Sequence, residues 1–252
     1  MTPPTHSGLD ATEAAQLQTS WETQQEPFLP HRAEAFEVLV QVAAEVAGGR
    51  GRPLRVLELA AGTGSITLRL LQTLAEVDAT VLEIDPVLLA IAGASIGDRA
   101  QIVEADLSDP GWPAKLPHQG FDVVLSGNAL HCFSAERLAD LYRQVRGVVG
   151  PGGAFALAEQ MPRKPEPGSG APDESASPEA VRAAVDAWDT WWVDVLSRPS
   201  LSAAAERRRH LQLCSADFYP DPAWHHDALT AAGFAGTGIG WSKADTVVLV
   251  AT

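Results

Sequence analysis

Residues 58–64, ELAAGTG, join an apolar stretch to a run of helix-forming residues through a turn of small residues. Such a turn lets a ligand approach the backbone closely, and the helix after it points unpaired N–H groups toward that ligand. A second apolar stretch follows and ends in acid at Glu83. An acid at the tip of the neighbouring parallel strand can accept the hydroxyls of a ribose. Together the two segments predict a pocket for a nucleoside-containing cofactor.

The residues around this turn weigh against cofactors that carry several phosphates. The dinucleotide fingerprint has a third small residue where this chain has Thr67, which disfavours a nicotinamide oxidoreductase. A phosphate-binding loop requires Gly-Lys-Ser/Thr, and no lysine lies near the turn. A ligand with a ribose and little phosphate is therefore favoured.

Five segments in order resemble the motifs of class I S-adenosylmethionine-dependent methyltransferases of the small-molecule, bacterial type. The turn is similar to the E/D-x-G-x-G-x-G motif of that family, with Ala60 in place of its first glycine. Residues 81–86 (VLEIDP) resemble the second motif, and residues 104–107 (EADL) resemble the third. Residues 121–131 (FDVVLSGNALH) resemble the fourth strand with its loop, and residues 148–155 (VVGPGGAF) resemble the helix-to-strand turn that follows. The resemblance covers residues 55–160.

This resemblance implies S-adenosyl-L-methionine as the cofactor and S-adenosyl-L-homocysteine as the product. It places Glu83 at the ribose position and an acid of the third motif, Asp106, near the adenine. Glu58 matches the acid that orients the cofactor's amino group, although an acid at a strand end can also serve only to cap backbone donors, and Asp85 is expected to cap a helix. The cofactor-binding residues predicted in this way, including three from the N-terminal region, are Glu58, Ala60, Gly62, Gly64, Glu83, Ile84, Asp106, Leu107, Asn128, Trp21, Gln25 and Arg32.

Methyl transfer is an in-line displacement, so the protein chiefly aligns the acceptor and excludes water. A general base helps when the acceptor carries a proton. His131 follows the fourth strand beside the expected methyl site and is the candidate catalytic residue. A structural histidine that closes this loop explains the same position.

Several aromatic residues beyond the resemblance could also reach the site. Trp188, Trp191 and Trp192 share one helix face, which predicts either an aromatic wall or, more usually, a core seam. Tyr219 and the pair at 225–226, both histidines, precede or begin the last helix and could reach the pocket mouth. Adjacent histidines in a helix point in different directions, so no metal site is expected.

The function predicted is S-adenosylmethionine-dependent methyl transfer to a small-molecule acceptor, at oxygen, nitrogen or carbon. The alternative is a domain that binds this cofactor without transferring its methyl group, either for another sulfonium-assisted reaction or as a regulatory or partner subunit. The fold alone does not separate these hypotheses, because function depends on the site.

Composition excludes several partners. A net charge of −14 argues against nucleic acid, and no apolar run reaches the roughly 20 residues of a membrane span. The first ten residues lack an apolar signal core, and Cys132 and Cys214 have no metal or redox spacing. We therefore expect a cytoplasmic protein with two buried thiols, while a pair between them stays open. A monomer or a homodimer is compatible with the sequence.

Strand and helix patterns alternate along the chain, which predicts a doubly wound α/β fold with a seven-stranded, mostly parallel sheet and an antiparallel last strand. Five strands are expected near 55–60, 79–84, 101–105, 121–126 and 153–159, and a hairpin closes the sheet near 236–251. The expected division is an N-terminal helical cover (1–53), a cofactor-binding core (54–160), a flexible connection and helical cap (161–220), and a last helix with the closing hairpin (221–252).

Overall fold

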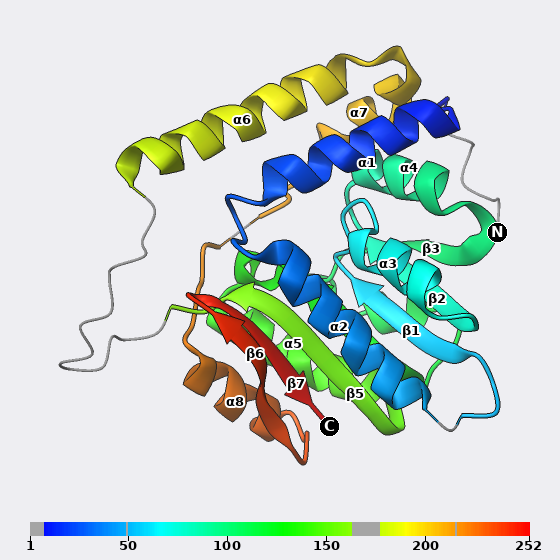
Figure 1. The fold of residues 1–252 in the computed structure, drawn as a ribbon, viewed down its shortest axis with the longest axis vertical. Helices are drawn as coiled ribbons and strands as arrows, with labels where there is room; N and C mark the ends of the chain where they lie inside the picture. Colours follow the sequence, from blue (N-terminus) through cyan, green and yellow to red (C-terminus); the bar gives the residue numbers. More distant parts are fainter. Residues whose placement is uncertain (1–7, 49, 163–176, 215) are drawn as a thin grey trace.

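The computed structural model describes residues 8–48, 50–162, 177–214 and 216–252, which form a single seven-stranded sheet covered by helices (Figure 1). The strands lie in the order β3-β2-β1-β4-β5-β7-β6. Their bounds are β1 Leu54–Leu59, β2 Val77–Glu83, β3 Ala100–Glu104, β4 Phe121–Gly127, β5 Val149–Gln160, β6 Thr237–Lys243 and β7 Thr246–Ala251. β7 pairs antiparallel with β5 and β6, and the other four neighbouring pairs are parallel, so the predicted fold class is confirmed. Much of the flexible connection predicted at the start of 161–220 lies outside the described residues.

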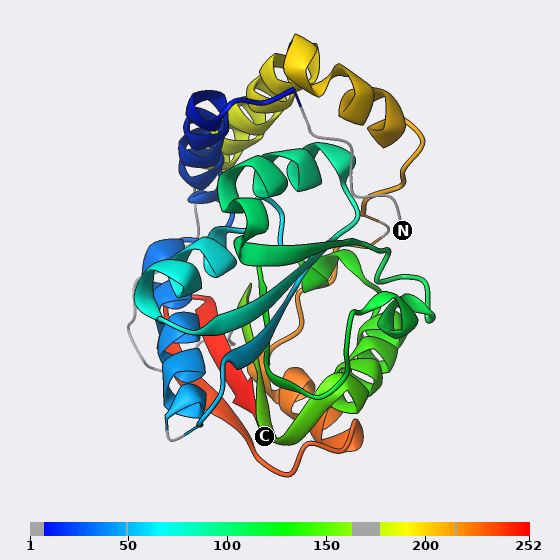
Figure 2. The ribbon, with the colours of Figure 1, turned by 90° about the vertical axis from the view of Figure 1, so that its right-hand side faces the viewer.

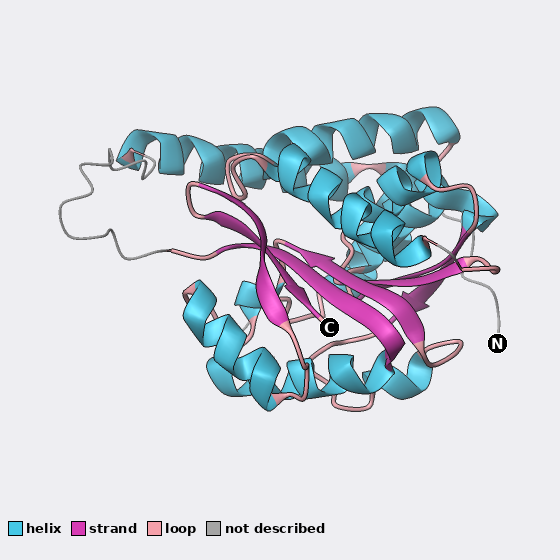
Figure 3. Cartoon of the chain, turned by 60° about the horizontal axis from the view of Figure 1, so that its bottom comes forward, coloured by secondary structure: helices cyan, strands magenta, loops and turns pink. Residues whose placement is uncertain are grey.

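Helices lie on both faces of this sheet, as Figure 3 shows. Their bounds are α1 Ala11–Gln25, α2 Arg32–Ala47, α3 Ser65–Thr73, α4 Pro86–Ile96, α5 Ala135–Val148, α6 Pro178–Ser197, α7 Ser202–Arg208 and α8 Pro222–Ala231. Among the described residues, none of these helices combines the length and apolar composition that crossing a membrane requires.

The sheet separates two apolar cores because strand side chains alternate between its faces. In β4, Val123 and Leu125 pack in the core that α2 covers, whereas Val124 packs on the opposite side with α5 and α8. The strand order reverses between β1 and β4, so the turns after these strands diverge and leave a crevice at their carboxyl ends. The predicted site segments that end or follow β1, β2, β3 and β4 lie at this edge.

A group of helices closes over the crevice from above. Figure 2 shows α1, α6 and α7 gathered beyond α4 at one end of the molecule. Their shared core contains Trp21 of α1, Trp191 and Trp192 of α6, and Leu88 of α4. The Nε1 group of Trp191 donates a hydrogen bond to Ser20 Oγ at 2.9 Å. The N-terminal helix α1 and the later helix α6 therefore form one layer above the carboxyl edge, whereas α2 packs on a face of the sheet.

Candidate active site

The turn after β1 depends on backbone conformations that favour glycine. Gly62 and Gly64 have φ angles of 59° and 78°, and Ala60 lies in the same left-handed region at 48°. Alanine pays about 1–2 kcal/mol for that conformation, so the departure from glycine stores strain beside the cavity. A Cβ on Gly62 would lie 3.3 Å from Cζ2 of Trp21, which covers this part of the turn.

Gly64 lies apart from the other predicted site residues. It is absent from the residues that line the cavity, and a Cβ at this position would lie 2.6 Å from Cδ1 of Ile96. Gly64 therefore permits the turn and the close packing of α4 against it. The positive φ angle that marks it as a glycine position is a property of the turn and does not require ligand contact.

Glu83 ends β2 and ties the two neighbouring turns together. Its Oε2 accepts a hydrogen bond from the Gly62 N–H at 2.8 Å, and its Oε1 accepts from the N–H groups of Ile84 and Asp85 at 2.7 and 2.9 Å. Burial raises the pKa of Glu83, although these hydrogen bonds oppose that rise. A carboxylate offers about four acceptor positions, so these three bonds leave room for a hydroxyl of a ligand.

Glu58 sits at the end of β1 and caps helix α3. It accepts hydrogen bonds from the Thr67 N–H at 2.8 Å, from the Thr67 hydroxyl, and from the Ile66 N–H at 3.4 Å. Burial raises the pKa of Glu58 to about 7. Glu58 also lines the cavity. It therefore caps backbone donors, as considered above, from a position on the cavity wall. Asp85 caps α4 through the Val87 N–H at 2.9 Å, as predicted, and also pairs with Arg208 at 2.6 Å.

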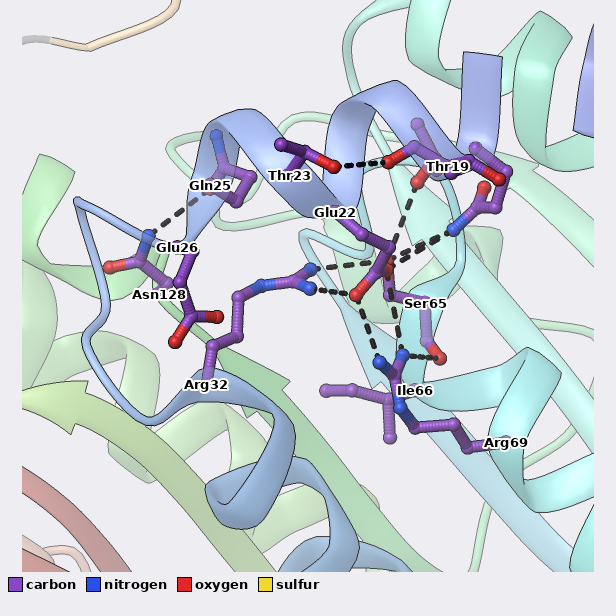
Figure 4. Close-up of polar contacts among 12 residues, drawn as sticks. Thr19, Glu22, Thr23, Gln25, Glu26, Arg32, Ser65, Ile66, Arg69 and Asn128 are labelled. Atoms are coloured by element: carbon purple, nitrogen blue, oxygen red, sulfur yellow. Dashed lines mark hydrogen bonds and ion pairs between the residues drawn. The ribbon is translucent and has the colours of Figure 1, made fainter. Parts of the chain in front are cut away.

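The N-terminal helices reach the cavity through a shared polar network (Figure 4). Arg32 of α2 pairs with Glu22 of α1 and donates to Ser65 Oγ at 3.1 Å, and Arg69 of α3 reaches the same Glu22 carboxylate at 2.9 Å. The Nε of Arg32 is buried and has no hydrogen-bond partner among the described residues. Arg32 is thus held in place by an ion pair and keeps one donor.

Gln25 and Asn128 connect the same cover to the loop after β4. The Asn128 side-chain amide donates to Gln25 Oε1 at 3.2 Å, as Figure 4 shows. Asn128 has a positive φ of 54°, a conformation that asparagine tolerates better than most residues. This contact places the end of α1 beside the loop that carries His131.

The partly buried His131 pairs with the buried Glu159 of β5. Its Nδ1 lies 3.0 Å from Glu159 Oε2, and the other oxygen of Glu159 accepts the N–H groups of Ala129 and Leu130 at 2.7 and 2.6 Å. Burial lowers the pKa of His131, but the nearby carboxylates of Glu159 and Asp217 outweigh that effect, and its pKa is raised above the usual value. Donation of the Nδ1 proton to Glu159 leaves Nε2 as the nitrogen able to accept a proton.

One cavity of about 810 Å³ collects nearly all of these residues. The predicted site residues on its wall are Trp21, Gln25, Arg32, Glu58, Ala60, Gly62, Glu83, Ile84, Asp106, Leu107, Asn128 and His131. The sequence patterns did not indicate Glu159, which supports His131, or Arg208 at the end of α7 and residues 210–213 after it, which line the cavity. Glu159 directly follows the apolar run 154–158 near the end of β5, and an acid at a strand end was the signal available for it.

The tryptophans of α6 combine the two roles considered for them. Trp191 and Trp192 are buried in the core with Trp21, while Trp188 and Trp192 also line the cavity. Tyr219 lies at the cavity wall as well. His225 and His226 do not line it: His225 Nδ1 meets the Tyr142 hydroxyl at 2.7 Å, and His226 Nδ1 contacts Thr237.

The two cysteines form a disulfide, so the expectation of two free thiols is wrong. Cys132 and Cys214 are joined with their Cα atoms 4.9 Å apart, and both line the cavity. They are 82 residues apart in the sequence, and nothing local in the spacing indicates the pairing. The predicted cytoplasmic location loses the support that free thiols would have given, and it stays a prediction.

The cavity suits S-adenosylmethionine in three respects. Gly62 leaves the backbone open to close approach, the Glu83 carboxylate keeps an acceptor position for a sugar hydroxyl, and the buried Nε of Arg32 is a donor without a partner among the described residues. Among the described residues no lysine lines the cavity, so the Lys of a phosphate-binding loop has no counterpart there.

The central part of the chain is similar in sequence to known methyltransferase domains. Residues 56–153 match the family model described as a methyltransferase domain. A region of the highly reducing polyketide synthase easB of Emericella nidulans is 34% identical over 123 residues, which is 44% of this chain and 5% of the synthase. The chain thus spans about one twentieth of that relative.

Two solved structures show the same fold over nearly the whole chain. The CurJ carbon methyltransferase has a TM-score of 0.62 and 17% identity, covering 96% of this chain and 61% of that one. DhpI, solved with SAM and HEP, has a TM-score of 0.54 and 19% identity, covering 99% and 100% of the two chains.

With the match to the domain model, these findings confirm the predicted enzyme class. Residues 56–153 match a methyltransferase domain, and the structural neighbour DhpI was solved with SAM. The relative named above is fungal, and the bacterial type stays a prediction.

The disulfide predicts a measurable loss of stability on reduction. We expect a Cys132→Ser, Cys214→Ser double variant to lose about 2–4 kcal/mol of unfolding free energy, because the bond closes a long loop in the unfolded chain. Urea denaturation of the oxidised protein and of the variant measures this difference. A reductant should lower the stability of the wild type and leave the variant unchanged. Alkylation of both cysteines in the native, unreduced protein would contradict the pairing.

Proposed function

We propose that this chain transfers the methyl group of S-adenosylmethionine to a small-molecule acceptor whose nucleophilic atom loses a proton, with His131 as the base. One observation carries the proposal: the turn after β1, Glu83 and His131 all line the same cavity, and Glu159 holds His131 through Nδ1. When bound, the cofactor supplies an electrophilic methyl group on a sulfonium.

The chain provides distinct partners for the two ends of the cofactor. Glu83 and the neighbouring Ile84 would hold the ribose, and Asp106 with Leu107 would border the adenine, because these residues follow β2 and β3 along one wall. Arg32 would hold the carboxylate of the methionine part, since its guanidinium is buried at the cavity and has a free Nε donor. Trp21 and Gln25 would cover this end from α1.

His131 and Glu159 would handle the acceptor's proton. Glu159 is 2% exposed and fixes the imidazole through Nδ1, so Nε2 is the atom that takes the proton. The neighbouring carboxylates raise the pKa of His131, which makes it a stronger base than an isolated imidazole. The cover formed by α1 and α6 excludes water from the same space.

The wall near His131 supports an acceptor with an apolar part. Phe28, Phe133, Val185 and Trp188 line the cavity together with the disulfide. The likeness to a region of a polyketide synthase and to a carbon methyltransferase supports an acidic carbon next to a carbonyl as the first acceptor to test. A phenol meets the same requirement for a base and is the second.

The direct test is product analysis with a defined acceptor panel. The purified chain is incubated with S-adenosylmethionine and β-keto thioesters, phenols or amines, and mass spectrometry follows S-adenosylhomocysteine and the methylated product. We expect turnover with at least one acceptor that carries an acidic C–H or O–H. Tight cofactor binding in calorimetry, with no S-adenosylhomocysteine from any acceptor, would favour a domain that binds the cofactor without transferring its methyl group.

Glu83→Ala should weaken cofactor binding by about 1.5–3 kcal/mol, the range for a hydrogen bond to a charged group. Isothermal calorimetry with S-adenosylhomocysteine measures the change. The matched control is Glu104→Ala, because Glu104 is the register partner of Glu83 on β3 but is exposed and does not line the cavity. Equal affinities for the folded Glu83→Ala variant and the wild type would refute the ribose assignment.

His131→Asn should lower kcat by about 10²–10⁴-fold, the usual contribution of a general base, with little change in cofactor affinity. In the wild type, kcat should rise with pH through a pKa above about 6.5, because only the neutral imidazole accepts a proton. Glu159→Gln should shift this pKa downward, since the carboxylate that raises it is gone. A pH profile that keeps its inflection in His131→Asn would exclude His131 as the base.

A further inference from the structure

A short segment after the cap lies against the loop that carries His131. It consists of Cys214 and residues 216–219, and we call it the clamp segment. The loop residues Leu130–Cys132 form a short 3₁₀ helix, η3. The clamp segment and η3 are distant in sequence. Cys214 and Tyr219 of the clamp segment form part of the cavity wall.

Three different contacts join the clamp segment to η3. The Cys132–Cys214 disulfide forms a covalent link. The Phe218 N–H donates a hydrogen bond to the His131 carbonyl oxygen at 2.9 Å. The Tyr219 ring stacks on the His131 imidazole, with ring centroids 4.7 Å apart and planes within 14°.

The clamp segment is itself anchored in the core. The Phe218 ring packs edge-on against Trp224 of α8, with centroids 5.1 Å apart. Asp221 then caps α8 by accepting from the Trp224 N–H at 2.9 Å. The residues on either side of Tyr219 are therefore tied to α8, while its own ring lies on the imidazole.

His131 is consequently restrained from several directions. Glu159 of β5 holds Nδ1, Phe218 holds the backbone oxygen, and Tyr219 covers one face of the ring. The titratable groups facing the imidazole are Glu159, Asp217 and Tyr219. The glutamate bond alone leaves the ring free to swing about Nδ1, and the stacked phenol removes that freedom.

We propose that Tyr219 is a positioning residue that orients His131 for methyl transfer, and that the Cys132–Cys214 disulfide keeps it there, so that thiol reduction slows the reaction. This inference rests on the proposed function. Cys214 and Tyr219 are exposed, which gives a reductant access. A dithiol transfers two electrons and two protons to the S–S bond, leaving two cysteine thiols and a cyclic disulfide of the reductant.

The test compares Tyr219→Leu and Tyr219→Phe with the wild type. We expect kcat to fall by about tenfold or more in Tyr219→Leu, since small misplacement of a catalytic group is costly, and to stay near the wild-type value in Tyr219→Phe, which keeps the stacked ring. Affinity for S-adenosylhomocysteine should not change in either variant. Circular dichroism verifies folding.

A second readout does not require turnover. The His131 imidazole C–H resonances, assigned by their loss in His131→Asn, should carry a ring-current shift that Tyr219→Phe retains and Tyr219→Leu removes. Dithiothreitol should move the same resonances in the wild type and lower its kcat, reversibly on reoxidation. The Cys132→Ser, Cys214→Ser double variant should have the kcat and His131 resonances of the reduced wild type, and dithiothreitol should change neither.

The outcomes separate the two levels of the proposal. No methyl transfer by the wild type, with the His131 resonances responding as expected, would refute the proposed function and leave the contact intact. Unchanged kcat in Tyr219→Leu would overturn the positioning role. Unchanged kcat and resonances after reduction, with both thiols then titrated, would overturn the role of the disulfide.

Discussion

The Glu83 carboxylate binds the N–H groups of Gly62, Ile84 and Asp85, and the rest of the site depends on these bonds. These bonds join the turn after β1 to the turn after β2, and the two turns belong to separate βα units. Burial of a carboxylate is costly, and three backbone donors offset that cost without a cationic partner. The floor of the cavity is therefore fixed before any ligand arrives, which reduces the entropy lost on binding.

A second buried acid, Glu159, organises the other half of the cavity in the same way. It accepts two backbone N–H groups from the loop after β4 and also holds His131. One carboxylate thus shapes the loop and sets the basicity of the residue that the loop carries. The clamp segment adds restraint from the far side, and the disulfide closes a loop whose ends are 82 residues apart. Crosslinking a loop of that length removes much of the freedom of the unfolded chain.

The cover unites two parts of the sequence that are far apart. Trp21 of α1 contacts Trp188, Trp191 and Trp192 of α6, with ring centroids 5.0 to 6.4 Å apart. Trp21 also lies over Gly62, so the aromatic cluster that stabilises the cover is part of the cavity roof. Arg208 extends the same layer by stacking on Trp192 at 3.7 Å and pairing with Asp85. Stability of the cover and exclusion of water from the site therefore come from the same contacts.

The sequence by itself determined the sheet, the cofactor turn and twelve of the residues on the cavity wall. These follow from local patterns, because apolar runs, small-residue turns and strand-end acids each specify their own geometry. The sequence also predicted that Gly64 contacts the cofactor. In a single sequence, a glycine that a turn requires cannot be distinguished from one that contacts a ligand. The disulfide, the Glu159–His131 pair and the Tyr219 stack were decided only by tertiary structure. Each joins residues whose separation along the chain carries no periodic signal, so only the folded arrangement of η3, β5 and the clamp segment brings them together.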